Sequence, residues 1–307
     1  MLNHINLVRG AFDGTMSSTG IKDKIAGGRG ILTGLIGAGI QGSRSPAMHM
    51  READAHGLRL IYRLYDLQVD GRSLDDLPRL LDALQMAGFA GVNVTHPVKQ
   101  RIIPLLDELS AEARQVGAVN TILFAGGRRI GHNTDWSGFA ESFTRTLGDA
   151  RIAKVVQIGA GGAGAATALA MLRLGCADLL IHDSSAERAT DLVERLSNDF
   201  PDARLTALTE SPEADMADAD GLVNATPIGM EGHPGMPIPA TWLRADMWVA
   251  DVIYFPLETA LLLAAKARGC ATLNGGGMAV FQAARAFDLF TGTIADRERM
   301  VRDFGTI

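Results

Sequence analysis

The chain has 307 residues, of which 47% are hydrophobic and 21% are charged, and its formal net charge at pH 7 is −6. This composition is typical of a globular protein with room for two domains. A net negative charge gives no general attraction for nucleic acid or for an anionic membrane surface. The two cysteines, Cys176 and Cys270, lie far apart and outside any Cys/His motif. We therefore expect a cytoplasmic protein without a metal, and without nucleic acid or a membrane as partner.

Residues 1–30 have neither the apolar core nor the cleavage site of a secretory signal, and the sequence predicts a loosely ordered leader there. From residue 31 on, short apolar runs alternate with helical patterns, which predicts an α/β fold with a mostly parallel sheet. Ser45-Pro46 is typical of a helix N-cap followed by proline in the first turn. The expected order is strand 31–37, helix 45–57, strand 59–67, helix 74–88, strand 91–95 and helix 100–109.

The stretch "GAVNTILFAGGRRIGHNTD" predicts a β-hairpin, because two strand-like runs flank the Gly126-Gly127 dipeptide. If Ala125 pairs with Arg128, the same register brings Asn120 and Asp135 to one end of the hairpin.

A second series of strands and helices begins with "KVVQIGAGGAGAATALAMLRLG" and predicts a complete Rossmann-like unit over residues 147–273. The helix that contains "GGGMAVFQAA" would then return to the first domain. The sequence thus predicts a two-domain α/β protein, with a substrate-binding catalytic domain formed by residues 31–146 and 274–307.

The loop "GAGGAG" places Gly159, Gly161 and Gly164 in a GxGxxG spacing between an apolar strand and a helix. These glycines allow a tight turn, close approach to a pyrophosphate and close helix–strand packing, and the helix N-terminus favours the phosphates. Asp183 ends the next strand, where a carboxylate can accept hydrogen bonds from the adenosine ribose, which favours NAD over NADP. Asp183 as a simple helix cap is the structural alternative. Arg188 lies near enough in sequence to keep NADP as a weaker alternative.

Lys99 follows the strand 91–95, and open α/β sheets bind ligands at the carboxyl ends of their strands. Asn93 and Thr95 have the same parity on this strand and face the same side. Buried polar side chains need partners, which a polyhydroxylated substrate would supply. A lysine ammonium can give a proton to a carbonyl while a nicotinamide carries the hydride. Asp135 is the candidate partner of Lys99, and a solvated surface lysine is the plain alternative.

Several segments occur in the order that is characteristic of one family. They are "GSRSPAMH", "GVNVTHPVK", "GAVNT", "GHNTD", the GxGxxG loop, "NATPIGM", "DVIYFPLET" and "GGGMAVFQAA". In these segments the chain resembles the shikimate dehydrogenases and their quinate/shikimate relatives, and the resemblance covers nearly all of residues 31–292.

The resemblance implies a reversible oxidation of shikimate to 3-dehydroshikimate, or of quinate to 3-dehydroquinate, with Lys99 and Asp135 as the catalytic pair. It implies that Ser43, Ser45 and Tyr254 bind the substrate carboxylate, and that Asn93, Thr95, Asn120, Asp135 and Gln282 bind ring hydroxyls. Together with the glycine-rich loop, it implies a cofactor site formed by Gly159, Gly161, Gly162, Gly164, Asp183, Thr226, Gly277 and Met278.

Three positions can be compared with the patterns of the family and of its branches. Asp183-Ser184-Ser185 replaces an Asn-Arg-Thr segment, and the loss of that arginine favours NAD and the NAD-preferring quinate/shikimate branch. Ser45 stands where that branch often has threonine, which favours shikimate over quinate. His96 replaces isoleucine and should face away from Asn93 and Thr95, so we expect a packed, hydrogen-bonded histidine rather than a catalytic one.

Two other functions stay open. Gly39 and Gly42, which replace proline and histidine of the family pattern, allow a related ring such as aminoshikimate or another cyclic polyol. A non-catalytic dinucleotide-binding sensor is the second alternative, and the retention of Lys99 and Asp135 argues against it. The expected partner is a small cyclic polyol carboxylate. A homodimer is compatible with the family, although no sequence feature fixes the oligomeric state.

Overall fold

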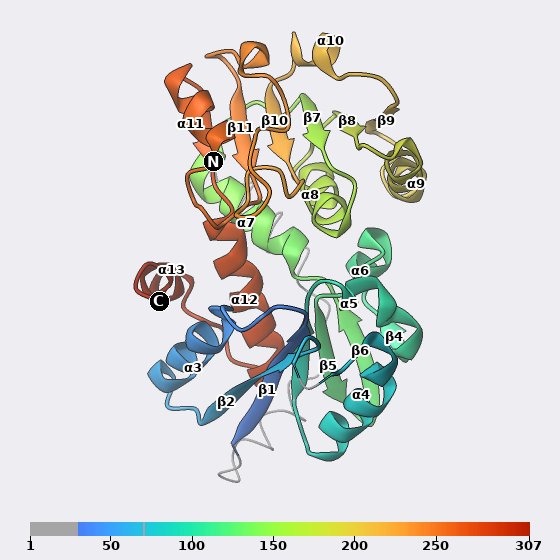
Figure 1. Ribbon diagram of the computed structural model, residues 1–307, viewed down its shortest axis with the longest axis vertical. Helices are drawn as coiled ribbons and strands as arrows, with labels where there is room; N and C mark the ends of the chain where they lie inside the picture. Colours follow the sequence, from blue (N-terminus) through green and yellow to red (C-terminus); the bar gives the residue numbers. More distant parts are fainter. Residues whose placement is uncertain (1–29, 70) are drawn as a thin grey trace.

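The computed structural model describes residues 30–69 and 71–307, so the predicted leader lies outside the described residues except for Gly30. The described chain forms two six-stranded sheets, each covered by helices (Figure 1). Strands β1 to β6 come from residues 31–132 and strands β7 to β12 from residues 154–273. The α/β class with two domains is confirmed, while the domain boundaries at 146/147 and 273/274 stay a prediction.

The first sheet has the strand order β2-β1-β3-β5-β6-β4. Only β5 runs antiparallel to its neighbours, so the prediction of a mostly parallel sheet is confirmed. The hairpin register is confirmed as well, because Ala125 pairs with Arg128 and Thr121 with His132. The strands are β1 (Ile31–Gly37), β2 (Leu60–Asp66), β3 (Gly91–Val94), β4 (Glu108–Leu109), β5 (Thr121–Ala125) and β6 (Arg128–His132).

Helices cover both faces of the first sheet. On one face Ile36, Val92 and Ile122 pack in a cluster with the buried leucines of α4. On the other face Leu35 and Leu60 pack with residues of α3 and of the later helix α12 (Gly276–Thr291). The helical segments in this part of the chain are α3 (Ser45–Ala55), η1 (Leu74–Asp76), α4 (Leu77–Met86), α5 (Val98–Arg101), η2 (Ile103–Leu105) and α6 (Ala111–Val116).

The helix predicted over residues 100–109 is wrong. The structure has the short α5, the 3-10 turn η2 and then strand β4. Pro104 lies in η2, where its ring and missing N–H prevent a continuous α-helix. The following residues pair with β6 instead, since Asp107 N donates to Arg129 O and Ser110 N to Gly131 O.

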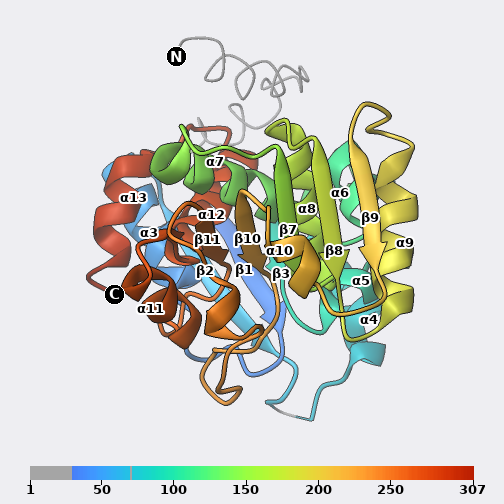
Figure 2. The ribbon, with the colours of Figure 1, turned by 90° about the horizontal axis from the view of Figure 1, so that it is seen from above.

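The second sheet is entirely parallel, with the order β12-β11-β10-β7-β8-β9. Its central strands read as continuous apolar runs because helices bury both faces. Val155 packs on the side of α8, and its neighbour Val156 packs on the side of α11. Figure 2 shows α9 beside β9 at one edge of this sheet. The strands are β7 (Lys154–Ile158), β8 (Asp178–His182), β9 (Arg204–Leu208), β10 (Gly221–Asn224), β11 (Trp248–Asp251) and β12 (Ala271–Leu273). The helical segments are α8 (Gly162–Arg173), α9 (Ala186–Ser197), α10 (Glu213–Met216), η3 (Ala240–Trp242) and α11 (Ala260–Ala267).

Two long helices join the sheets. Helix α7 (Asp135–Leu147) leads from β6 to the second sheet, and α12 (Gly276–Thr291) returns to the first, followed by α13 (Arg297–Phe304). Figure 1 shows α7 and α12 between the two sheets, with β1 running toward the second sheet and β10 and β11 running toward the first. The carboxyl ends of the strands in both sheets therefore face each other, and ligands of parallel sheets bind at such ends.

Candidate functional site

Lys99 and Asp135 meet between the sheets. Lys99 lies in α5, just after β3, and Asp135 is the first residue of α7, just after β6. The Lys99 Nζ atom lies 2.6 Å from Asp135 Oδ2, and their side chains are 25% and 9% exposed. This pairing supports the prediction that Asp135 is the partner of Lys99. Because Lys99 is still partly exposed, its ammonium can also reach a bound molecule.

The side chains of Asn120 and Asn133 also form hydrogen bonds with Asp135. Asn120 Nδ2 donates to Asp135 Oδ1 at 2.9 Å, and Asn133 Oδ1 accepts the backbone N–H of Asp135 at 3.0 Å. Asn120 also donates to Thr134 Oγ1 and accepts the Thr134 N–H, so its amide is fully engaged inside the protein. The Asp135 carboxylate is thus fixed in direction before any ligand binds.

Asn93 and Thr95 extend the polar surface toward β1 and β2. Asn93 is 6% exposed, and its Oδ1 accepts a hydrogen bond from the Tyr62 hydroxyl at 2.9 Å. Burial raises the pKa of Tyr62, and a hydrogen bond with the Ser45 side chain lowers it in part, so the phenol stays a neutral donor. Thr95 follows β3, and its methyl group lies so close to Gly37 that a Cβ there would stand 2.4 Å away.

Ser43 and Ser45 lie at the start of α3, but the predicted N-cap role of Ser45 is wrong. Ser45 is the first helical residue and Arg44 occupies the N-cap position, without a side-chain cap. Ser43 Oγ instead accepts the Ser45 N–H at 3.3 Å. The short turn before Pro46 shifts the helix start by one residue, and the Ser45 hydroxyl is left beside Tyr62.

The residues expected from α12 lie against α7. A Cβ on Gly138 of α7 would stand 2.8 Å from Met278 O and 3.0 Å from the Gln282 Cβ. A Cβ on Gly277 would stand 2.1 Å from the Ser142 hydroxyl of α7, so Gly277 serves the helix crossing. The Gln282 side chain donates to Ala279 O in its own helix.

The glycine-rich loop has the geometry of a dinucleotide cradle. Gly159 has φ 106°, which suits the tight turn, and a Cβ on Gly164 would stand 2.1 Å from Gly159 O, where helix and strand touch. A Cβ on Gly161 or Gly162 would meet no atom within 4 Å. These two glycines therefore leave open space in front of the N-terminus of α8, as a pyrophosphate requires.

Asp183 follows β8 beside that loop. Its Oδ2 accepts the Ala160 N–H at 2.8 Å, and its Oδ1 accepts the Ser185 N–H at 2.8 Å and Arg188 Nη2 at 2.6 Å. Burial alone would raise the pKa of Asp183, but these hydrogen bonds hold it below its ordinary value. Ser185, rather than Asp183, caps helix α9. The carboxylate is thus tied to the cofactor loop.

Thr226 and Tyr254 lie on the loops after β10 and β11. Thr226 donates its hydroxyl to Asn224 Oδ1 at 2.7 Å, whereas Tyr254 is 52% exposed. Asp251 joins the two loops, because its carboxylate accepts hydrogen bonds from Asn224 Nδ2 and from the Ile253 N–H. No hydrogen bond links these residues to the Lys99–Asp135 pair in the part of the chain that the structure describes.

The prediction for His96 is wrong. Its side chain is exposed and makes no hydrogen bond to any residue that the structure describes, although its carbonyl accepts the Ala38 N–H at 3.0 Å. The strand ends at Val94, so the alternation that would have buried His96 does not continue to it.

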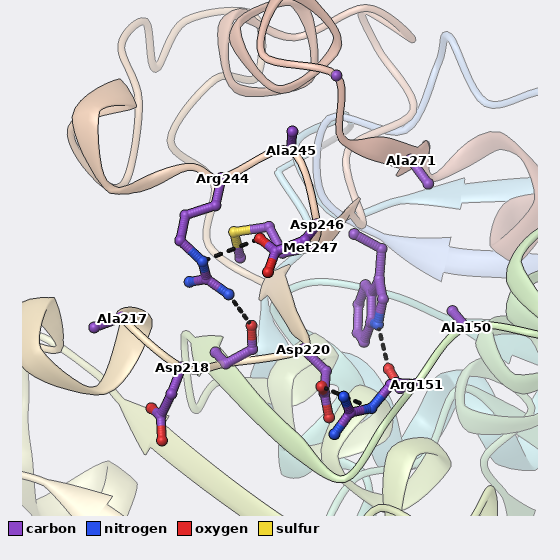
Figure 3. A pocket seen from close by; sticks show the side chains of 13 residues that line it. Ala150, Arg151, Ala217, Asp218, Asp220, Arg244, Ala245, Asp246, Met247 and Ala271 are labelled. Atoms are coloured by element: carbon purple, nitrogen blue, oxygen red, sulfur yellow. Dashed lines mark hydrogen bonds and ion pairs between the residues drawn. The ribbon is translucent and has the colours of Figure 1, made fainter.

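A hollow of about 610 Å³ lies elsewhere, at the amino ends of β10, β11 and β12 (Figure 3). Its charged side chains already have partners: Arg244 donates to Ala219 O and Asp246, and Arg151 pairs with Asp220. Ligands of parallel sheets bind at the carboxyl ends of the strands, so we do not assign the chemistry to this hollow.

Two general expectations concern metals and membranes. Residues 30–69 and 71–307 contain no group of three or more His, Cys, Asp or Glu side chains placed to hold a metal ion. In the same ranges no helix has both the length and the apolar character needed to span a bilayer.

Sequence reasoning missed several polar residues of the site. Tyr62, Thr121 and Asn133 all contact predicted site residues, and Asp251 organises the loops beside them. A signal was present for some of them, since Thr121, Asn133 and Asp251 lie within the motifs quoted above. Tyr62 stands in an alternating strand, where an aromatic residue is ordinary core.

Comparison with known proteins places the site in context. The family model described as the shikimate dehydrogenase substrate binding domain matches residues 35–122. A shikimate dehydrogenase (NADP(+)) of Streptomyces avermitilis is 51% identical over 90% of this chain and 95% of its own length. A quinate/shikimate dehydrogenase (NAD(+)) of Corynebacterium glutamicum is 46% identical over 89% of this chain and 98% of its own.

A solved structure agrees with these sequence matches. The quinate dehydrogenase from Corynebacterium glutamicum in complex with NAD superimposes with a TM-score of 0.85 at 44% identity. The superposition covers 91% of this chain and 99% of the other. Both the substrate-binding part and the Rossmann-like part of the chain therefore have relatives of known structure.

Proposed function

The chain belongs to the shikimate dehydrogenase family, and on that premise we propose that it interconverts shikimate and 3-dehydroshikimate, and also quinate and 3-dehydroquinate, with a nicotinamide cofactor. The observation that carries this proposal is the 2.6 Å contact between Lys99 and Asp135 at the facing carboxyl ends of the two sheets. A sensor that only bound a dinucleotide would have no need of such a pair.

The chemistry divides between the cofactor and the pair. When bound, the nicotinamide takes up or gives the hydride of the ring carbon. During oxidation the neutral amine of Lys99 accepts the hydroxyl proton, and during reduction its ammonium form gives a proton to the ketone oxygen. The Lys99 ammonium is the donor that faces outward, and Asp135 fixes its position. Asn93 and Thr95 supply polar contacts to the ring, beside Tyr62.

The carboxylate of the substrate would bind at the start of α3. Ser43 and Ser45 present hydroxyls there, and the first turn of a helix favours an anion. Ser45 has the hydroxyl but not the methyl group of the threonine that the quinate/shikimate branch often carries at this position. We propose shikimate as the better substrate and quinate as the poorer one.

For the cofactor we propose a preference for NAD over NADP. The Asp183 carboxylate would accept hydrogen bonds from the ribose hydroxyls and would repel a 2′-phosphate. Its hydrogen bond from the Ala160 N–H keeps it beside the glycine-rich loop. Arg188 forms an ion pair with the same carboxylate, and its side chain is 57% exposed, so it can turn toward a 2′-phosphate. We therefore expect the protein to use NADP as well, but with a lower kcat/KM than NAD. Both cysteines are free and buried, which supports the cytoplasm as the compartment.

The test is a steady-state assay of the purified full chain, with shikimate or quinate and with NAD or NADP in all four combinations. We expect the largest kcat/KM for shikimate with NAD, measured from the absorbance of the reduced cofactor. A larger kcat/KM with NADP would contradict the cofactor proposal alone. No turnover of either acid with either cofactor, in a protein that binds NAD, would contradict the substrate proposal and favour another ring or a sensor.

A further inference from the structure

A chain of buried hydrogen bonds connects Tyr62 to Asp135 beneath the candidate site. Tyr62 donates to Asn93 Oδ1 at 2.9 Å, and Asn93 Nδ2 donates to Thr121 Oγ1 at 2.9 Å. Thr121 Oγ1 donates to Asn120 Oδ1 at 3.1 Å, and Asn120 Nδ2 donates to Asp135 Oδ1. Thr121 is fully buried in β5. In this series of hydrogen bonds, its hydroxyl links the side chain of Asn93 to the side chain of Asn120.

One backbone group fixes the direction of these bonds. The N–H of Thr134 points at Asn120 from 2.8 Å, and because an N–H can only donate, the atom facing it is the amide oxygen. That oxygen can only accept, so the Thr121 hydroxyl must point its hydrogen at Asn120. Asn120 Nδ2 is thereby turned toward Asp135.

The same constraint passes through Thr121 to Asn93. The Thr121 oxygen has given its hydrogen to Asn120, so it can only accept from Asn93, whose Nδ2 must face it. Asn120 O, 3.3 Å from the same nitrogen, agrees with this orientation. Asn93 Oδ1 is then turned toward the Tyr62 hydroxyl. The Thr121 hydroxyl therefore carries the orientation that the Thr134 N–H imposes on Asn120 over to Asn93.

We propose that Thr121 is a positioning residue, whose hydroxyl joins Asn93 to the fixed amide of Asn120 and so holds Asn93 toward the ring substrate. This inference rests on the proposed function, because Asn93 and Asp135 matter only if the site binds and oxidises a ring alcohol. Without the hydroxyl, Asn93 loses an acceptor and Asn120 loses a donor. Asn120 keeps the Thr134 N–H and Thr134 Oγ1 as partners, so it still faces Asp135. Asn93 keeps only Asn120 O and the Tyr62 hydroxyl, so its amide can turn away from the ring.

The test compares two buried threonines of the same sheet. Thr121→Val removes the hydroxyl, keeps the shape and suits a β-strand. The matched control is Thr33→Val in β1, since Thr33 is equally buried and its hydroxyl donates only to Gly91 O, at 3.0 Å. Thr121→Ser restores the hydroxyl without the methyl group. The readouts are kcat and KM for shikimate, the Kd for NAD from the quenching of protein fluorescence, and Tm.

We expect Thr121→Val to lose about tenfold in kcat/KM for shikimate, mainly through a higher KM, and to keep the wild-type Kd for NAD. Thr33→Val should lower Tm by a similar amount and keep the wild-type kcat/KM, and Thr121→Ser should recover most of the activity. Equal kinetics of Thr121→Val and Thr33→Val would overturn the inference, as would a Thr121→Ser variant no more active than Thr121→Val.

A second variant covers the case in which Thr121→Val does not fold. Tyr62→Phe removes the donor to Asn93 Oδ1 and leaves the ring in place, so it should also lower kcat/KM for shikimate without changing the Kd for NAD. A wild-type kcat/KM in Tyr62→Phe would then overturn the inference. The wild-type assay is separate from all of these, because its failure would contradict the proposed function and not the role of Thr121.

Discussion

Gly138 of α7 lies directly against Gln282 of α12, so closely that a Cβ on the glycine would stand 2.7 Å from the Gln282 backbone nitrogen. Asp135 begins the same turn of α7, and Met278 and Gln282 belong to the facing turn of α12. This crossing sets how far the α12 residues lie from the Lys99–Asp135 pair. Any side chain at position 138 must therefore push the two helices apart.

Gly138→Ala should destabilise the protein by about 1–3 kcal/mol, because the added methyl group meets backbone that cannot turn aside. We also expect KM for shikimate to rise as Gln282 moves away from the site. Urea denaturation and steady-state kinetics measure the two effects. The control is Gly305→Ala, where a Cβ would stand at an ordinary 3.5 Å from Arg302 O. An unchanged free energy of unfolding in Gly138→Ala would contradict the packing argument.

Lys99→Met should lower kcat for shikimate by about 10²–10⁴-fold, because the proton donor is lost while the bulk of the side chain stays. KM should change little if Lys99 acts chiefly in the transition state. The control is Lys266→Met, which removes an exposed lysine whose Nζ lies 2.8 Å from Glu258. A variant at position 99 with near-normal kcat would exclude Lys99 as the proton donor.

Arg188→Gln should lower kcat/KM for NADP by about tenfold and change that for NAD much less, because only NADP carries a 2′-phosphate. Asp183→Ala should have the opposite selectivity, since it removes the acceptor for the ribose hydroxyls. The control is Arg128→Gln, which alters an exposed arginine paired with Glu108. If Asp183→Ala weakened both cofactors equally, the ribose role of Asp183 would be untenable.

His49 should make the fold sensitive to mild acid. It is fully buried among Tyr62, Phe287 and Phe290, and burial lowers its pKa from 6.5 to about 3. Below pH 6.5 His49 becomes protonated in the unfolded chain but stays neutral in the folded chain. Its contribution to the free energy of unfolding is therefore complete above this pH and is lost as the pH falls. Between about pH 8 and pH 5 this group should account for about 2 kcal/mol of lost stability.

His49→Phe tests this, because it removes the titrating group and keeps a ring. Urea denaturation gives the free energy of unfolding at about pH 8 and pH 5. The decrease between the two pH values should be smaller in His49→Phe than in the wild type by about 2 kcal/mol. Phe287→Leu, a core change without a titrating group, should destabilise the protein equally at both pH values. A His49→Phe variant with the full wild-type difference would show that other groups cause the acid loss.

The sequence by itself determined the parts of the protein that depend on neighbours along the chain. The strand–glycine–helix order around Gly159 and Gly164 predicts the cofactor loop, because turn geometry and helix–strand contact are local. The Gly126-Gly127 turn likewise fixed the hairpin register, which brings Asn120 to Asp135. The family motifs identified Lys99 as a candidate catalytic residue, and the order of the predicted elements placed it just after a strand.

Only the tertiary structure decided which polar groups meet. Thr121 comes from β5 and Asn93 from β3, and only the pairing of these strands puts the Thr121 hydroxyl between two amides. His96 is exposed because the strand stops early, which alternation along the sequence does not reveal. The contact of Gly138 with Gln282 joins α7, which precedes all strands of the second sheet in the sequence, to α12, which follows them. Such contacts arise from packing between distant segments, and no local pattern encodes them.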